Sequence, residues 1–231
     1  MTPEVRIMLK EYTRRFVVCI TGLAVFGLGN AFGVLAGSAG TNAWNTLSLG
    51  ISGSLGISFG SASFVISLII IFLDLLGKGK IGFGTILNTF LVSIFSDLWI
   101  GLFSGLPAPA GLLALLCTLL GQTVCSVATI IYMMPGLGCG PRDTLMVLVG
   151  NRFPRAPIGA VKFAIEVVAL LCGILLGAPF GLGTVLVMVL QASIFQLCCR
   201  IFRFEPRALV HEDVLDTLRR VRPGRGFPQR G

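Results

Sequence analysis

The sequence predicts an all-α integral membrane protein. We expect six transmembrane helices in two three-helix repeats of inverted topology, each with a short broken or re-entrant helix. Three observations lead to this prediction: the composition, the placement of the basic residues and an internal repeat. Of the 231 residues, 55% are hydrophobic and 12% are charged, and the mean hydropathy is +0.92. This composition excludes a soluble domain, because the apolar residues gather in runs of about twenty, the length that crosses a bilayer.

Six apolar runs are long enough to span a membrane. The first follows Arg14 and Arg15, and we expect it to be a retained helix, because it is too long for the core of a signal peptide and lacks a convincing cleavage site. The predicted spans are Phe16–Gly37, Ser58–Leu76, Gly82–Phe103, Ala110–Met134, Ile158–Leu176 and Leu182–Phe202.

The basic residues orient the chain. All eighteen precede the first run, separate the second from the third, lie between the fourth and the body of the fifth, or lie at the end of the sixth and beyond. The alternate connections hold none, so the positive-inside rule predicts that both termini are cytoplasmic. The net charge of +8 therefore reports topology rather than nucleic-acid binding. The expected parts are an interfacial lead-in (1–15), membrane repeat A (16–105), membrane repeat B (106–202) and a basic cytoplasmic tail (203–231).

The two repeats share landmarks in the same order. Asn45-Thr46-Leu47 recurs 98 residues later as Asp143-Thr144-Leu145, and Gly82-Phe83-Gly84-Thr85 recurs 99 residues later as Gly181-Leu182-Gly183-Thr184. Each repeat crosses the membrane three times, so the second is expected to lie upside down relative to the first. Repeats of this kind place their binding site where interrupted segments meet near the middle of the membrane.

Each repeat contains such an interrupted segment. Gly37–Gly50 and Gly136–Gly150 each begin with a glycine-broken polar turn and continue as an apolar stretch too short to cross a bilayer. Whether they are re-entrant or lie on the surface stays open. In the re-entrant arrangement one approaches from outside and the other from inside, so the positive ends of their helix dipoles would meet in a shared cavity.

The motifs around these segments also indicate a family. They are Trp44-x-x-Leu47 after a glycine-rich turn, Gly82-x-Gly84-Thr85-x-x-Asn88 with Asp97 downstream, Gly138-x-Gly140-Pro141-Arg142-Asp143-x-Leu145-Met146, and Gly181-x-Gly183-Thr184. In these motifs the chain resembles the YczE/YyaS/YitT type of small bacterial membrane proteins, over residues 14–202. One departure is Ala43 before Trp44, where that family often has proline. The resemblance implies a multi-pass protein of the bacterial inner membrane and no particular substrate.

Arg142 is the sharpest candidate for a functional residue. It follows Pro141 at the start of a short helix, where the positive dipole end favours Asp143 and opposes an arginine. A residue that breaks a local rule suggests a task, here the binding of an anion. The alternative is that Arg142 is a topology charge in a cytoplasmic loop. The predicted substrate-binding residues are Trp44, Asn45, Asn88, Gly138, Gly140, Arg142 and Asp143.

Two carboxylates are candidates for proton coupling. Glu166 lies about 12 Å into its helix at ~1.5 Å per residue, near the middle of the bilayer. Its alternative is a local pair with Lys162 one turn earlier. Asp97 is nearer the outer face, where water could solvate it. A third carboxylate, Asp74, is expected to form an exposed pair with Lys78 at the end of its helix.

Smaller signals favour structural roles. The two Gly-x-Gly-Thr segments suit a tight helix start better than an anion cradle. Asn30, Gln122, Gln191 and Gln196 are expected to make hydrogen bonds between helices, and the glycines four apart at 29, 33 and 37 are expected to let another helix approach closely.

The sequence shows no catalytic constellation. His211 is the single histidine, and no HExxH, GxSxG or Walker sequence is present. We therefore expect neither an enzyme nor a metal or cofactor site. The predicted function is a transporter or permease for a small polar or anionic solute, with proton coupling as an option. Two alternatives stay open: a solute-binding membrane subunit that needs a separate energising partner, and a structural or regulatory membrane protein that transports nothing. Whether the protein also assembles with a second copy of itself stays open.

Overall fold

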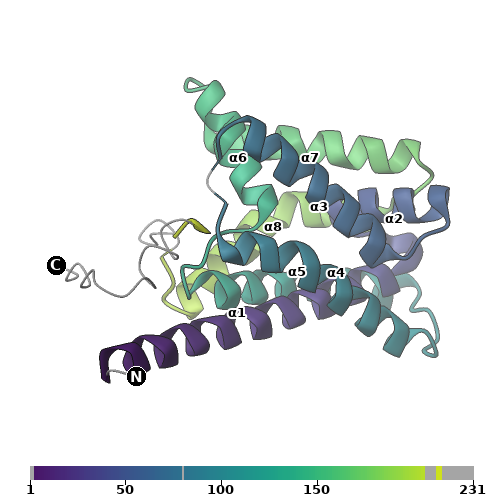
Figure 1. Ribbon diagram of the computed structural model, residues 1–231. Coiled ribbons are helices and arrows are strands. Elements are labelled where there is room, and N and C mark those ends of the chain that lie inside the picture. The colour runs from purple at the N-terminus through teal and green to yellow at the C-terminus, as the bar shows by residue number, and fades with distance from the viewer. Residues whose placement is uncertain (1–2, 80, 206–211, 215–231) are drawn as a thin grey trace.

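The computed structural model describes residues 3–79, 81–205 and 212–214, and most of the predicted tail, with His211, lies outside them. The described residues form eight α-helices and one short 3₁₀ turn, with no β-strand (Figure 1). In chain order they are α1 (Pro3–Leu35), η1 (Gly37–Ala39), α2 (Ala43–Leu55), α3 (Phe59–Leu76), α4 (Phe83–Phe103), α5 (Gly111–Met133), α6 (Pro141–Arg152), α7 (Ile158–Leu175) and α8 (Leu182–Ile201).

Six of these helices are long and apolar enough to cross a membrane. They are α3, α4, α5, α7, α8 and the part of α1 from Leu9 to Leu35. Five predicted spans agree with them to within one residue at each end. The first differs at both ends: α1 is one continuous helix from Pro3, so the expected lead-in forms its first turns, and it ends at Leu35, two residues before the predicted Gly37.

The remaining helices, α2 and α6, have 13 and 12 residues and are too short to span a bilayer. Helix α2 begins where the Asn42 side chain accepts a hydrogen bond from the backbone N–H of Asn45 at 2.9 Å. It ends at Gly56, which adopts the left-handed conformation that favours glycine. Helix α6 begins with Pro141 at its first position, where a missing N–H costs nothing.

The long helix α1 packs mainly against α5 and α4. It meets α5 where two glycines face each other: a Cβ at Gly29 would lie 2.8 Å from the carbonyl oxygen of Gly121, and a Cβ at Gly121 would lie 2.7 Å from that of Gly29. Only glycine permits this approach, which is typical of close helix packing in membranes. The expectation for Gly29 is therefore confirmed.

The start of α4 is held by the turn before α6. The Gly84 N–H donates to the carbonyl of Leu137 at 2.7 Å, and the Thr85 hydroxyl donates to the carbonyl of Cys139 at 2.6 Å. Gly138, with φ of 125°, lies so close to Gly82 that neither position has room for a side chain. The first Gly-x-Gly-Thr segment is thus a tight helix start locked onto the turn of the other half.

The start of α8 meets the turn before α2 in the same way. Gly181 lies against the carbonyls of Ser38 and Ala39, and Gly40 lies against the side chain of Thr184. The carbonyl of Gly40 accepts a hydrogen bond from the Thr118 hydroxyl of α5 at 2.7 Å. Each broken turn is therefore fixed by a helix from the opposite half of the chain.

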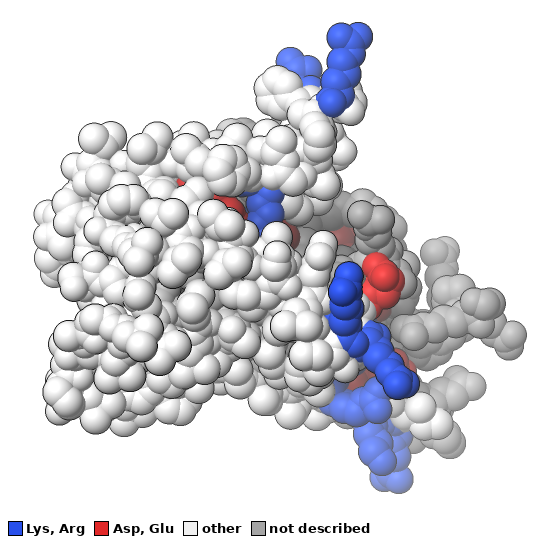
Figure 2. All heavy atoms as spheres, turned by 180° about the vertical axis from the view of Figure 1, so that it is seen from behind, with Lys and Arg blue, Asp and Glu red and all other residues white. Residues whose placement is uncertain are grey.

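Charged side chains are concentrated at one end of the molecule. On the face seen in Figure 2, the described lysines and arginines gather at the end where α1 begins and α8 ends in Figure 1, and the rest of that face is nearly uncharged. Asp74 departs from its expected exposure: it is 0% exposed, and neither carboxylate oxygen has a hydrogen-bond partner among the described residues. The expectation of an exposed pair was wrong because α6 packs against α3 and covers this end of it.

Candidate functional site

A cavity of about 530 Å³ lies at the centre of the bundle, and all eight described α-helices contribute to its lining. The first residues of both short helices line it: Asn42 to Trp44 from α2, and Gly140 to Asp143 from α6. Figure 1 shows α2 toward the end of the bundle opposite the α1 start, and α6 toward the end that contains it. The positive ends of the two helix dipoles therefore reach one cavity from opposite directions.

Arg142 stacks its guanidinium on the indole of Trp44, 4.8 Å from the ring centroid. The structure gives the guanidinium no hydrogen bond or ion pair with any described residue, so its N–H donors remain available to the cavity. Burial lowers the pKa of Arg142 to about 10, an effect that the charge of Asp143 opposes. Arg142 is therefore still a cation at neutral pH.

Asp143 lies beside Arg142 in the first turn of α6, where the helix dipole favours a carboxylate. Its Oδ2 accepts a hydrogen bond from the Tyr132 hydroxyl of α5 at 3.4 Å. Asn88 of α4 also lines the cavity and lies next to Gly140, because a Cβ on that glycine would be 3.6 Å from the Asn88 amide nitrogen. The first turn of α6 therefore presents a cation and an anion to the cavity, Arg142 and Asp143, and neutral polar side chains of α4 and α5 lie beside them.

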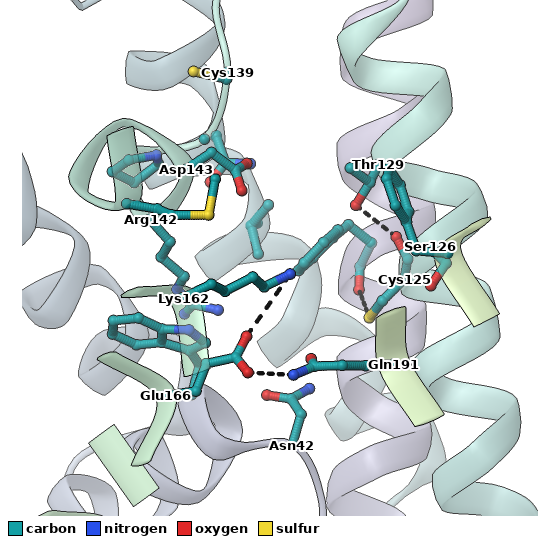
Figure 3. A pocket seen from close by; sticks show the side chains of 18 of the residues that line it. Asn42, Cys125, Ser126, Thr129, Cys139, Arg142, Asp143, Lys162, Glu166 and Gln191 are labelled. Carbon is teal, nitrogen blue, oxygen red and sulfur yellow. Dashed lines mark hydrogen bonds and ion pairs between the residues drawn. The ribbon is translucent and has the colours of Figure 1, made fainter. Parts of the chain in front are cut away.

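Glu166 forms a second polar cluster in the cavity (Figure 3). Its Oε1 lies 3.8 Å from the Lys162 ammonium, and its Oε2 accepts a hydrogen bond from the Gln191 amide of α8. Glu166 is only 5% exposed, whereas the Lys162 side chain is 47% exposed. The local pair considered in the sequence therefore exists, and the same carboxylate also faces the cavity.

The structure brings most of the predicted site residues together. Six of the nine line the cavity: Trp44, Asn88, Gly140, Arg142, Asp143 and Glu166. Two others lie behind its wall. Asn45 is 1% exposed and points back to the Thr41 hydroxyl, 3.4 Å away, while Gly138 packs against Gly82 as described above.

Asp97 lies away from the cavity. Its carboxylate accepts hydrogen bonds from the Ser58 hydroxyl and from the Gly60 N–H, both at 2.6 Å. Ser58 is the N-cap residue of α3, so Asp97 of α4 closes the first turn of a neighbouring helix. This contact gives Asp97 a structural role that its sequence position did not indicate.

Several cavity residues were not predicted. Asn45 was among the predicted binding residues and Asn42 was not, although Asn42 precedes the apolar stretch at the position of an N-cap. The larger omission is a polar face of α5 whose residues recur at helical spacing and could have been recognised from that period. This face comprises Gln122, Cys125, Ser126, Thr129 and Tyr132. Among the described residues no group of three His, Cys, Asp or Glu side chains could hold a metal ion.

Comparison with known proteins identifies the family. Residues 13–200 match the family described as a family of unknown function, DUF6198. The chain belongs to this family. The match covers both short helices and all six candidate spans, apart from residues 9–12 of the first span and Ile201 of the last.

The DUF6198 chain has curated relatives in two bacteria. It is 33% identical over 181 residues to an uncharacterized protein of Haemophilus influenzae, covering 78% of this chain and 80% of the relative. It is 25% identical over 190 residues to the uncharacterized membrane protein YczE of Bacillus subtilis, covering 82% and 87%. It is 26% identical over 179 residues to YyaS of the same organism, covering 76% and 88%. The resemblance to the YczE/YyaS type is thereby confirmed, and no solved structure matches.

Proposed function

We propose that this DUF6198 protein is a transporter or permease for a small polar or anionic solute. One observation carries the proposal: the N-termini of the two short helices line a single cavity, and Arg142 at one of them lines it with a guanidinium that has no hydrogen bond or ion pair with any described residue. Helix N-termini and arginine donors both favour an anion. In transporters built from inverted repeats, interrupted helices of this kind form the substrate site.

The packing pattern supports an inverted repeat. Exchanging the two halves pairs α1 with α5, α2 with α6, α3 with α7 and α4 with α8. Under this exchange the packing of α1 on α4 corresponds to that of α5 on α8, and the packing of α2 on α7 corresponds to that of α6 on α3. The two locked turns at Gly40 and Gly138 correspond as well. A cavity between such halves can open alternately to the two sides of a membrane.

The charge distribution supports an orientation. The basic end of the molecule would lie in the cytoplasm by the positive-inside rule, with both chain termini there. Helix α6 would then approach from the cytoplasm and α2 from outside, in the inner membrane of a bacterium. Glu166 is the proposed site of proton coupling, since it is a buried carboxylate that lines the cavity and contacts both Lys162 and Gln191. Asp97 is engaged by the Ser58 hydroxyl and the Gly60 N–H at the start of α3, away from the cavity, so the proposal assigns proton coupling to Glu166 alone.

The experiment that tests this proposal is a thermal-shift screen of the purified protein against pooled small anions and polar metabolites. A binder raises the melting temperature by mass action. We expect at least one hit that Arg142→Ala abolishes. Arg152→Ala is the matched control, because Arg152 is an exposed arginine in the last turn of the same helix and does not line the cavity.

The outcomes separate the functional classes. If the hits persist in Arg142→Ala, the binding site lies elsewhere than at the short helices. A folded protein without any hit would contradict the transporter proposal and favour a structural or regulatory role. A hit without uptake in proteoliposomes would favour a solute-binding subunit, and co-purification of an ATPase would strengthen that reading.

A further inference from the structure

A second cavity adjoins the first and is almost entirely apolar. It has a volume of about 510 Å³ and lies among α2, α3, α6 and α7. Its rim is formed by large side chains that stay exposed in the bundle, including Ile69 at 54%, Leu73 at 44% and Val168 at 61%. Since α3 and α7 are membrane-spanning helices, these side chains face the hydrocarbon of the bilayer. We call this space the lateral groove.

The lateral groove and the polar cavity share a wall. Trp44 and Ile165 line both spaces. The indole of Trp44 carries the Arg142 guanidinium over its ring, 4.8 Å from the centroid, while the same residue contributes apolar surface to the groove. A cationic donor group and a hydrocarbon-lined space are therefore separated by a single side chain.

We propose that the substrate of this site is an amphipathic anion, a molecule with one hydrocarbon chain and an anionic headgroup, which binds with its chain in the lateral groove and its headgroup at Arg142. This inference rests on the proposed function, because it uses the same anion site. The hydrocarbon chain of the substrate would enter the lateral groove directly from the bilayer, between α3 and α7. The headgroup would pass Trp44 into the polar cavity, whose size is in the range of ligand pockets.

Charge complementarity favours an anionic headgroup over a neutral or cationic one. The carboxylates of the cavity already have partners, Tyr132 for Asp143 and the pair of Lys162 and Gln191 for Glu166. The Arg142 donors have none among the described residues. A phosphate or carboxylate headgroup would satisfy them with charge-assisted hydrogen bonds.

Fluorescence of Trp44 provides the test. The chain contains two tryptophans, and Trp99→Phe leaves Trp44 as the single reporter. This full-length variant would be reconstituted in phosphatidylcholine nanodiscs and titrated with dodecyl phosphate brominated in mid-chain. Brominated dodecanol, which has the same chain and no charge, is the control probe. Bromine quenches indole fluorescence only at short range, so quenching shows that the hydrocarbon chain of the probe lies beside Trp44.

We expect dodecyl phosphate to quench at a membrane concentration at least about tenfold lower than dodecanol, the gain typical of charge-assisted bonds. Arg142→Gln should abolish this difference. Val168→Phe, which fills the groove, should weaken quenching by the phosphate probe. Val189→Phe is the matched control, because Val189 is 70% exposed on α8 and lines neither cavity.

Three results would overturn the inference. If both probes quench equally and Arg142→Gln has no effect, the lateral groove is an ordinary lipid-facing surface without an anion site. Competition by butyl phosphate as strong as that by unbrominated dodecyl phosphate would show a small-anion site, so the proposed function would stand without this substrate class. Absence of quenching in a folded protein would show that the hydrocarbon chain of the probe does not enter the lateral groove. The proposed function would then be tested separately by the thermal-shift screen.

Discussion

The two threonines of the Gly-x-Gly-Thr segments give a matched pair for testing how the broken turns are held. Thr85 and Thr184 occupy corresponding positions at the starts of α4 and α8, and both are 0% exposed. The Thr85 hydroxyl donates to the Cys139 carbonyl at 2.6 Å, whereas the Thr184 hydroxyl has no partner among the described residues. The same substitution, threonine to valine, should therefore have opposite consequences at the two sites.

The magnitude follows from the bonds that are lost. Thr85→Val removes two buried hydrogen bonds, the one donated to the Cys139 carbonyl and the one accepted from the Gly82 N–H at 3.3 Å, which costs about 1–2 kcal/mol. For a chain of this length about 1 kcal/mol corresponds to roughly 2–4 °C, so the melting temperature should fall by roughly 2–8 °C. Thr184→Val removes a buried hydroxyl that makes no bond, so the melting temperature should stay the same or rise.

The assay is thermal unfolding in detergent, followed with a thiol-reactive dye that reports exposure of the buried cysteines, such as Cys19, Cys125 and Cys198. Thr85→Ser retains the hydroxyl and controls for loss of the methyl group. Equal destabilisation by both valine substitutions would refute the reasoning, because it would mean that the hydroxyls play no different part at the two turns.

Three further predictions concern single positions. Asp97→Ala removes both hydrogen bonds to the first turn of α3 and should cost about 1–3 kcal/mol, while leaving ligand-induced thermal shifts intact; loss of those shifts would return Asp97 to the site. Asp74→Leu replaces a buried carboxyl that has no hydrogen-bond partner among the described residues and should leave the melting temperature unchanged or raise it, so a fall of several degrees would reveal a partner. Gly29→Ala should lower the melting temperature, since a Cβ there meets α5, whereas Gly101→Ala, which meets nothing within 4 Å, should be neutral or slightly stabilising; equal effects would contradict the close packing.

The site shows where sequence reasoning reaches its limit. Pro141 and Arg142 were identified because the rules of helix starts are local: proline suits the first position, and a cation there is out of place. Asn42 and Asn45 both lie at the start of a short helix, and the repeat favoured Asn45 because it corresponds to Asp143, whereas no local rule shows which of the two faces the cavity. The structure decided that Asn42 caps α2 and faces the cavity, while Asn45 points to Thr41.

The carboxylates show the same limit in another form. Hydropathy gives the depth of Asp97 and Asp74 in their helices but not which neighbours surround them. Asp97 meets the start of α3, and Asp74 is covered by α6. Both contacts join segments that are far apart in the chain, so no local pattern records them.

The sequence by itself determined the number of candidate membrane spans, the bounds of five of them, the two short helices and the segregation of charge, because a bilayer imposes length and polarity on each segment separately. Tertiary structure alone decided which polar groups share the central cavity, which broken turn locks onto which helix, and that an apolar groove lies one indole away from Arg142. These features depend on how all eight described α-helices pack around a common centre, and packing is a property of the assembled bundle rather than of any one segment.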